Sequence, residues 1–224
     1  MIGAEERAAL SAAARQRSQT YWWLSEFFLA APDAAAIANL VRHGREAVDS
    51  PEDAPLAARL RELAVAPGTA DAAALAVEHA RLFAGLGESY GPPPPYEALH
   101  PRIAARENPF SHATEAYRAA GFDRIDVPAV PQDHLAVELR FMALLAAQES
   151  PAWGDPDIEA ARTLVLRERL FLDEHLLAWV PAYCERIATE TREPFYAAAA
   201  RMTAEALAQD RRNIDDLLRA AAPA

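Results

Sequence analysis

A carboxylate, an imidazole and a second carboxylate follow one another where the chain reads PQDHLAVELRFM, at residues 131–142. Asp133 stands directly after a proline-containing loop, where an aspartate side chain can accept hydrogen bonds from the free amides that begin a helix. Glu138 comes four residues after His134, so a helix would project both side chains from one face. Together they would offer negative charge and hydrogen-bond acceptors to a cationic ligand. Spacing alone leaves a second interpretation open, an ordinary helix cap with a polar pair beside it.

Four consecutive prolines at residues 92–95 mark a second candidate region. Because prolines lack the backbone donor and have a fixed φ angle, we expect an extended, ordered loop here. Tyr90 and Tyr96 flank the prolines, Glu97 follows, and Phe83 ends the apolar helical pattern that precedes them. Such a loop is either a stiff spacer between helices or one wall of a groove that binds a partner.

The residues that enzymes use for metal or nucleotide chemistry do not assemble into a site. Glu97 and His100 have the Glu-x-x-His spacing of half a di-iron site, but such a site needs a second pair, which the sequence lacks. No lysine occurs, so a phosphate-binding loop of the Gly-x-x-x-x-Gly-Lys type is excluded. A Gly-x-Ser-x-Gly nucleophile turn is also missing. We therefore expect neither an enzyme nor a bound metal or cofactor.

The charge balance favours a basic partner over a nucleic acid. The chain carries 33 acidic and 22 basic residues, a net charge of −11, and every basic residue is arginine. Nucleic-acid binding needs a basic face, whereas an acidic surface attracts a basic peptide. The single cysteine, Cys184, cannot form an internal disulfide, and no apolar run is long enough for a secretory signal or a membrane span. We expect a soluble, cytoplasmic protein that does not insert into membranes.

Helical periodicity must position these residues, because it extends over nearly the whole chain and strand-like alternation does not occur. Asp33 and Asp71 stand where helix caps are expected, a break is expected from Ser150 to Pro156, and Pro181 should kink or interrupt a long helix. We predict one all-α domain, a bundle of about nine to eleven helices over residues 1–224 with a proline-rich hinge at residues 87–96. Helices are expected around residues 10–28, 34–41, 56–63, 72–83, 114–120, 134–146, 158–180 and 194–218.

The order of these motifs resembles the TorD/DmsD family of redox-enzyme maturation chaperones, with nitrate-reductase assembly chaperones as more distant relatives. The resemblance covers roughly residues 10 to 180. It is carried by Leu-Phe-x-Gly at residues 82–85, Pro-Pro-Tyr-Glu at residues 94–97 and Asp-His-Leu-x-x-Glu-Leu-x-Phe-Met at residues 133–142. Two positions depart from the family pattern: Ala98 stands in place of a serine and His100 in place of a tyrosine, so details of partner recognition are expected to differ.

The resemblance implies an all-helical chaperone that binds the twin-arginine leader and apoprotein of a molybdopterin-containing oxidoreductase until its cofactor is inserted. It also implies that the Asp-His loop and the neighbouring groove bind the leader. A twin-arginine leader offers two guanidinium groups beside an apolar stretch, so its receptor needs carboxylates and an apolar wall. The expected leader-binding residues are Asp133, His134, Glu138, Tyr96, Glu97, Pro95, Leu135 and Phe83.

Two further alternatives remain at this point. The chain is also compatible with an acidic helical interaction module that binds another protein partner without recognising a leader. A monomer and a domain-swapped dimer are both compatible with long helices joined by proline hinges.

Overall fold

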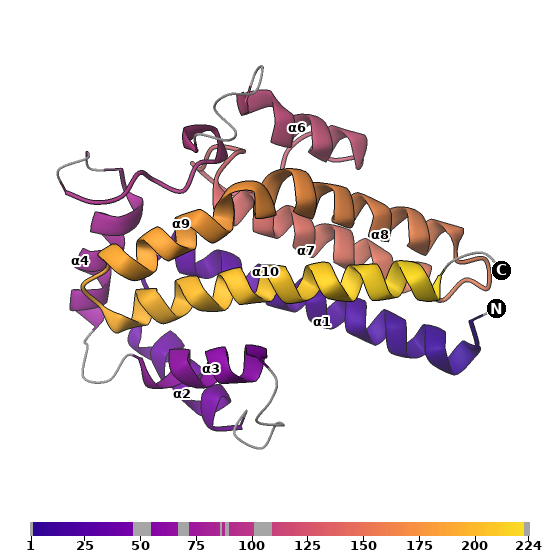
Figure 1. The fold of residues 1–224 in the computed structure, drawn as a ribbon, viewed down its shortest axis with the longest axis horizontal. Helices are drawn as coiled ribbons and strands as arrows, with labels where there is room; N and C mark the ends of the chain where they lie inside the picture. The colour runs from indigo at the N-terminus through magenta and orange to yellow at the C-terminus, as the bar shows by residue number, and fades with distance from the viewer. Residues whose placement is uncertain are drawn as a thin grey trace.

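The computed structural model describes residues 2–46, 55–66, 72–85, 87, 90–100 and 109–221, and these residues form helices joined by loops (Figure 1). The only strand-like pairing among them is an isolated bridge between Tyr96 and His134, so the expected all-α fold is confirmed. The helices are α1 (Ala4–Leu29), α2 (Ala34–Glu46), α3 (Pro55–Val65), α4 (Ala72–Phe83), α6 (Pro109–Ala119), α7 (Leu135–Ala152), α8 (Glu159–Phe171), α9 (Leu177–Glu190) and α10 (Pro194–Ala220).

The long helices α1, α7, α8, α9 and α10 lie side by side as the body of the bundle, with α2 and α3 on one flank and α6 on the other (Figure 1). α7 is buried over most of its length, which is typical of a central helix that is apolar on several sides. One face of α1, with Tyr21, Leu24 and Phe28, is buried, and α1 packs along α7. Burial of these apolar faces is the main stabilising contribution to the fold.

Local signals located several helix ends correctly. Asp33 accepts a hydrogen bond from the amide of Ala36 (Oδ1···N 2.7 Å), as expected for a cap of α2. α10 begins at Pro194. Proline suits the first turn of a helix because a backbone N–H at that position would have no partner within the helix. The expected cap at Asp71 lies outside the described residues, as do residues 88–89 of the expected hinge.

The break expected at residues 150–156 begins later, at residue 153, and the irregularity expected at Pro181 lies elsewhere. α7 continues to Ala152 with Pro151 inside its last turn, where the amide of Trp153 still reaches the carbonyl of Glu149. Pro181 lies within α9, and the irregular turn is a π-helical segment at Leu172–Leu176, upstream of it. A proline has no N–H to donate to the carbonyl four residues before it, yet α9 continues through Pro181.

The proline loop is seated against the end of α4. Arg81 donates a hydrogen bond from Nη1 to the carbonyl of Tyr90 (3.2 Å). A Cβ atom added to Gly91 would lie 2.1 Å from the backbone oxygen of Arg81, so only glycine allows this close approach. The start of the loop is therefore fixed to the bundle.

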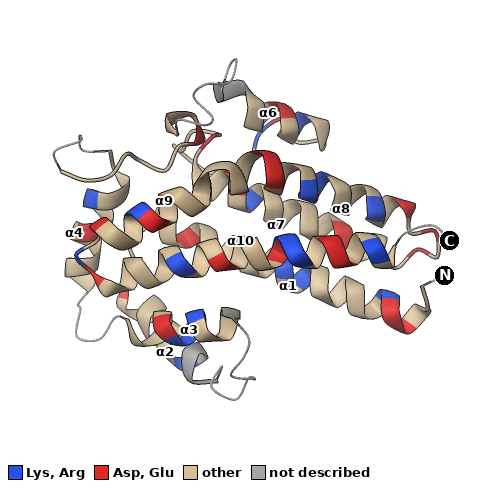
Figure 2. Cartoon of the chain, in the orientation of Figure 1, with Lys and Arg blue, Asp and Glu red and all other residues tan. Residues whose placement is uncertain are grey.

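Charged side chains of both signs are interspersed along the outer helices, most visibly on α10 (Figure 2). Within the described part of the chain, no helix is both long and apolar enough to cross a membrane.

Candidate functional site

The two motifs identified in the sequence meet in space although they lie far apart along the chain. The amide of Glu97 donates to the carbonyl of Asp133, and the amide of Leu135 donates to the carbonyl of Pro95, each with an N···O distance of 2.8 Å. These two bonds form the isolated antiparallel bridge at the start of α7. The loop–helix junction, as we call it, consists of residues 95–97 and 133–135.

The N-cap of α7 is His134, whereas Asp133 was the expected cap. His134 Nδ1 accepts a hydrogen bond from the amide of Ala136 at 3.0 Å, and its ring packs edge-on against Tyr96 with centroids 5.5 Å apart. Burial, together with the neighbouring His79, lowers the pKa of His134 to about 4. Because this pKa lies well below 7, His134 is neutral near neutral pH, and its unprotonated Nδ1 can accept the capping hydrogen bond.

The side chain of Asp133 contacts the turn that follows the prolines and not the start of α7. Its carboxylate accepts hydrogen bonds from its own amide and from the amide of Ala98, which belongs to the short 3₁₀ turn Glu97–Leu99. Asp133 therefore caps the turn that follows the prolines. Burial raises the pKa of this carboxyl despite those bonds, and Glu97 adds to the rise.

Three carboxyl groups gather beneath the junction, and we call Glu97, Asp133 and Glu138 the carboxylate cluster. Glu97 and Glu138 are fully buried and Asp133 is 5% exposed. Glu97 Oε1 lies 2.9 Å from His175 Nδ1, and Glu138 Oε2 accepts from Trp179 Nε1 at 3.3 Å. Burial raises the pKa of Glu138 well above its usual range, and the nearby carboxyls of Glu97 and Asp133 add to this effect.

The cluster contains unused acceptors. One oxygen on each of Glu97, Asp133 and Glu138 is buried without a hydrogen-bond partner. Buried oxygens of this kind are costly to leave unpaired, so a proton or a cationic group would stabilise them. Over the residues that the structure describes, no group of three or more His, Cys, Asp or Glu side chains is placed to hold a metal ion.

A hollow of about 720 Å³, the proline-loop groove, lies beside the junction between the prolines and α9. The prolines form one wall of this hollow, and binding of a partner there stays a prediction. Sequence reasoning did not identify the other wall, which contains Leu99, His100 and Tyr183. His100 packs on Trp179 with ring centroids 4.4 Å apart, and burial lowers its pKa to about 4, with Arg186 adding to the effect.

The structure brings seven of the eight expected leader-binding residues together and leaves one apart. Phe83 makes its ring contacts with Phe28, His79 and Tyr196 and none with the residues of the junction. None of the eight lines the proline-loop groove. Tyr96 is partly exposed, while the acids face inward. Contact between these acids and a leader stays a prediction, and it requires the loop to lift from α7.

The sequence matches a known protein family over most of its length. Residues 49–185 match the nitrate reductase delta subunit family, and this range is more than half of the chain. The chain belongs to this family, which includes the TorD chaperones, so the resemblance seen in its motifs is confirmed. Both motifs of the loop–helix junction lie inside the matched range.

Individual relatives match a shorter stretch. The chain is 35% identical over 89 residues to the chaperone protein TorD of Vibrio cholerae serotype O1, strain O395, and the match covers 39% of each chain. The same identity and coverage hold for TorD of strain M66-2. For TorD of the El Tor Inaba strain the identity is 33% over 87 residues, covering 39% of this chain and 38% of that protein. The matched segment thus spans less than half the length of these relatives.

Proposed function

We propose that this protein is a cytoplasmic chaperone that binds the twin-arginine leader and the apoprotein of a molybdopterin-containing oxidoreductase. It would hold this client for cofactor insertion before export, without catalysing a reaction itself. Family membership and the likeness to TorD support the proposal. The observation that carries it is the loop–helix junction, where the proline loop and the start of α7 bring three buried carboxyl groups together.

The proposed binding step exchanges one set of contacts for another. Two backbone hydrogen bonds and the ring contact between Tyr96 and His134 join the loop to the start of α7, so binding would have to break these contacts while α7 stays packed. Lifting the loop would expose Asp133 and Glu138, whose unpaired oxygens suit the donors of a guanidinium group, while Glu97 would move with the loop. The apolar part of the leader would lie in the proline-loop groove next to it. The net charge of −11 would steer the basic leader toward the chaperone.

The test is calorimetric titration with a synthetic twin-arginine leader, beside the same peptide with both arginines replaced by glutamine. We expect a Kd of about 1 μM or tighter for the first peptide and a Kd at least about tenfold weaker for the second. Equal affinity for the two peptides would contradict arginine recognition. No binding to leaders of several candidate molybdoenzymes would favour an interaction module that recognises another partner.

Variants of the carboxylate cluster test whether the leader binds at the loop–helix junction. Glu97→Gln should weaken leader binding by about tenfold, because it removes one charge that faces the guanidinium groups. The matched control is Asp123→Asn, which removes an exposed charge from a loop outside the junction. Thermal unfolding of both variants separates loss of binding from loss of stability. A Glu97→Gln variant that keeps full affinity would place the leader elsewhere.

A further inference from the structure

A second concave surface lies between α1 and α10, and a buried arginine forms its floor. Arg17 of α1 reaches Glu149 of α7 (Nη1···Oε2 2.6 Å), Glu168 of α8 and Asp210 of α10 (Nε···Oδ1 2.6 Å). Tyr21 donates a further hydrogen bond to Asp210 Oδ2 at 2.7 Å. One guanidinium thus joins four helices, so the floor is held in a single arrangement before any partner arrives.

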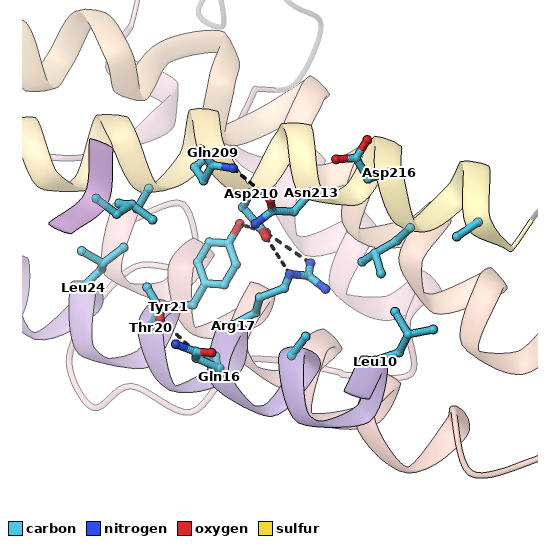
Figure 3. A pocket seen from close by; sticks show the side chains of 15 residues that line it. Leu10, Gln16, Arg17, Thr20, Tyr21, Leu24, Gln209, Asp210, Asn213 and Asp216 are labelled. Carbon is cyan, nitrogen blue, oxygen red and sulfur yellow. Dashed lines mark hydrogen bonds and ion pairs between the residues drawn. The ribbon is translucent and has the colours of Figure 1, made fainter. Parts of the chain in front are cut away.

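Above this floor, α1 and α10 stand apart and leave a cavity of about 450 Å³, which we call the α1–α10 groove (Figure 3). Figure 3 shows Arg17 and Tyr21 pointing from α1 toward Asp210 of α10 across the floor. Uncharged polar side chains form most of the rim: Gln16, Thr20, Gln209 and Asn213. Apolar side chains from three helices form the walls: Leu10, Ala13, Leu24, Leu56, Ala206, Leu217 and Ala220.

The groove has the length of a short helix. Its lining extends from Leu10 to Leu24 on α1 and from Ala206 to Ala220 on α10, which is the same number of residues on both helices. At about 1.5 Å per residue each wall is about 21 Å long, or about four helical turns. The two helices run in opposite directions, so the walls match end to end (Figure 1). An apolar channel between two helices is a typical receptor for the apolar face of a third.

The charges of the groove favour a basic occupant. Its charged lining residues are Arg17, Asp210 and Asp216. Arg17 is already engaged by three carboxylates, including Asp210, so it does not repel a cation at the rim. Asp216 lies exposed on α10, where it pairs with the equally exposed Arg219. Because an exposed ion pair of this kind contributes little to stability, a cationic side chain of a partner can take the place of Arg219. The net charge of the whole chain, −11, acts in the same direction.

We propose that the α1–α10 groove is a docking site for an amphipathic helix of about four turns, presented by a basic protein partner. The apolar face of that helix enters between α1 and α10, and its basic residues lie over the rim near Asp216. This surface is separate from the loop–helix junction, and its use does not depend on leader recognition.

The test uses a fluorescent synthetic helix of about 18 residues, with leucines at helical spacing on one face and arginines elsewhere, followed by fluorescence anisotropy. Ala13→Trp fills the groove from an exposed position on α1 and should weaken binding by about tenfold or more. Ala12→Trp is the matched control, since Ala12 is exposed on the same helix but does not line the groove. Ala220→Trp repeats the test from α10 in case Ala13→Trp does not fold.

Three outcomes would overturn the proposal. Equal affinity of Ala13→Trp, Ala12→Trp and the unaltered protein would place the peptide elsewhere. Equal affinity for a peptide with glutamates in place of the arginines would remove the basic partner. A self-associating protein that becomes monomeric with Ala13→Trp would make a second copy the occupant. Leader titration of the same variants is a separate readout, so failure here and failure of leader recognition are distinguishable.

Discussion

Replacing Arg17 with methionine should lower the free energy of unfolding by about 3–5 kcal/mol, because removal of one partner leaves buried charges uncompensated. The arginine side chain is only 10% exposed, and the carboxylates of Glu149 and Glu168 that it contacts are fully buried. Methionine keeps much of the length and apolar contact of the side chain, so lost packing contributes little. For a chain of this size the loss corresponds to a fall in Tm of about 6–20 °C.

The loss should depend on pH in a defined direction. Burial already raises the pKa of Glu168 well above its usual range, Glu149 and Asp210 add to this, and Arg17 opposes it. Without Arg17, the pKa of Glu168 in the folded state rises further above its unfolded value. The folded state of the variant then binds more protons than the unfolded state, so its stability falls as pH rises above about 4.5. The difference from the unaltered protein should be small near about pH 5 and large near about pH 8.

Urea unfolding followed by circular dichroism at these two pH values measures the effect. Arg212→Met is the control, because Arg212 forms an exposed ion pair with Glu205 and should contribute about 1 kcal/mol or less. Adding Glu168→Gln to Arg17→Met should restore part of the stability at high pH, since one buried charge is removed. The reasoning is refuted if Arg17→Met costs no more than Arg212→Met, or if its cost is the same at both pH values.

Three further predictions concern single groups. Glu138→Gln should raise the stability near about pH 8 and make it depend less on pH, as measured by urea unfolding. The reason is that the pKa of Glu138 is raised in the folded state, so the unaltered protein loses stability as the pH rises toward that pKa. A steeper pH dependence in the variant would contradict this. His134→Ala should cost about 0.5–2 kcal/mol in thermal unfolding by removing the cap of α7, and His134→Asn should recover most of it. The Cys184 thiol is buried and its pKa is raised to about 12, so we expect no reaction with a thiol reagent near pH 8 until urea unfolds the chain.

Local signals in the sequence were sufficient for the helices. The spacing of apolar residues, the cap at Asp33 and the first-turn proline Pro194 act within one or two turns, so they predict an all-α chain without knowledge of its packing. The motifs also identified the family, because their spacing is a property of the chain itself. Proline positions were less informative about where helices end. Pro151 lies within α7 and Pro181 within α9, because packing against neighbouring helices can outweigh the cost of one lost backbone hydrogen bond.

Only the tertiary structure decided which side chains meet. Asp133 was expected to cap α7, yet its carboxylate accepts hydrogen bonds from a turn more than thirty residues earlier, and His134 is the cap. Arg17 lies in a polar stretch of α1 with no local sign of its role, and its partners are 132, 151 and 193 residues away. Periodicity specifies the face on which a residue lies, but only the packing of helices against one another determines what that face contacts.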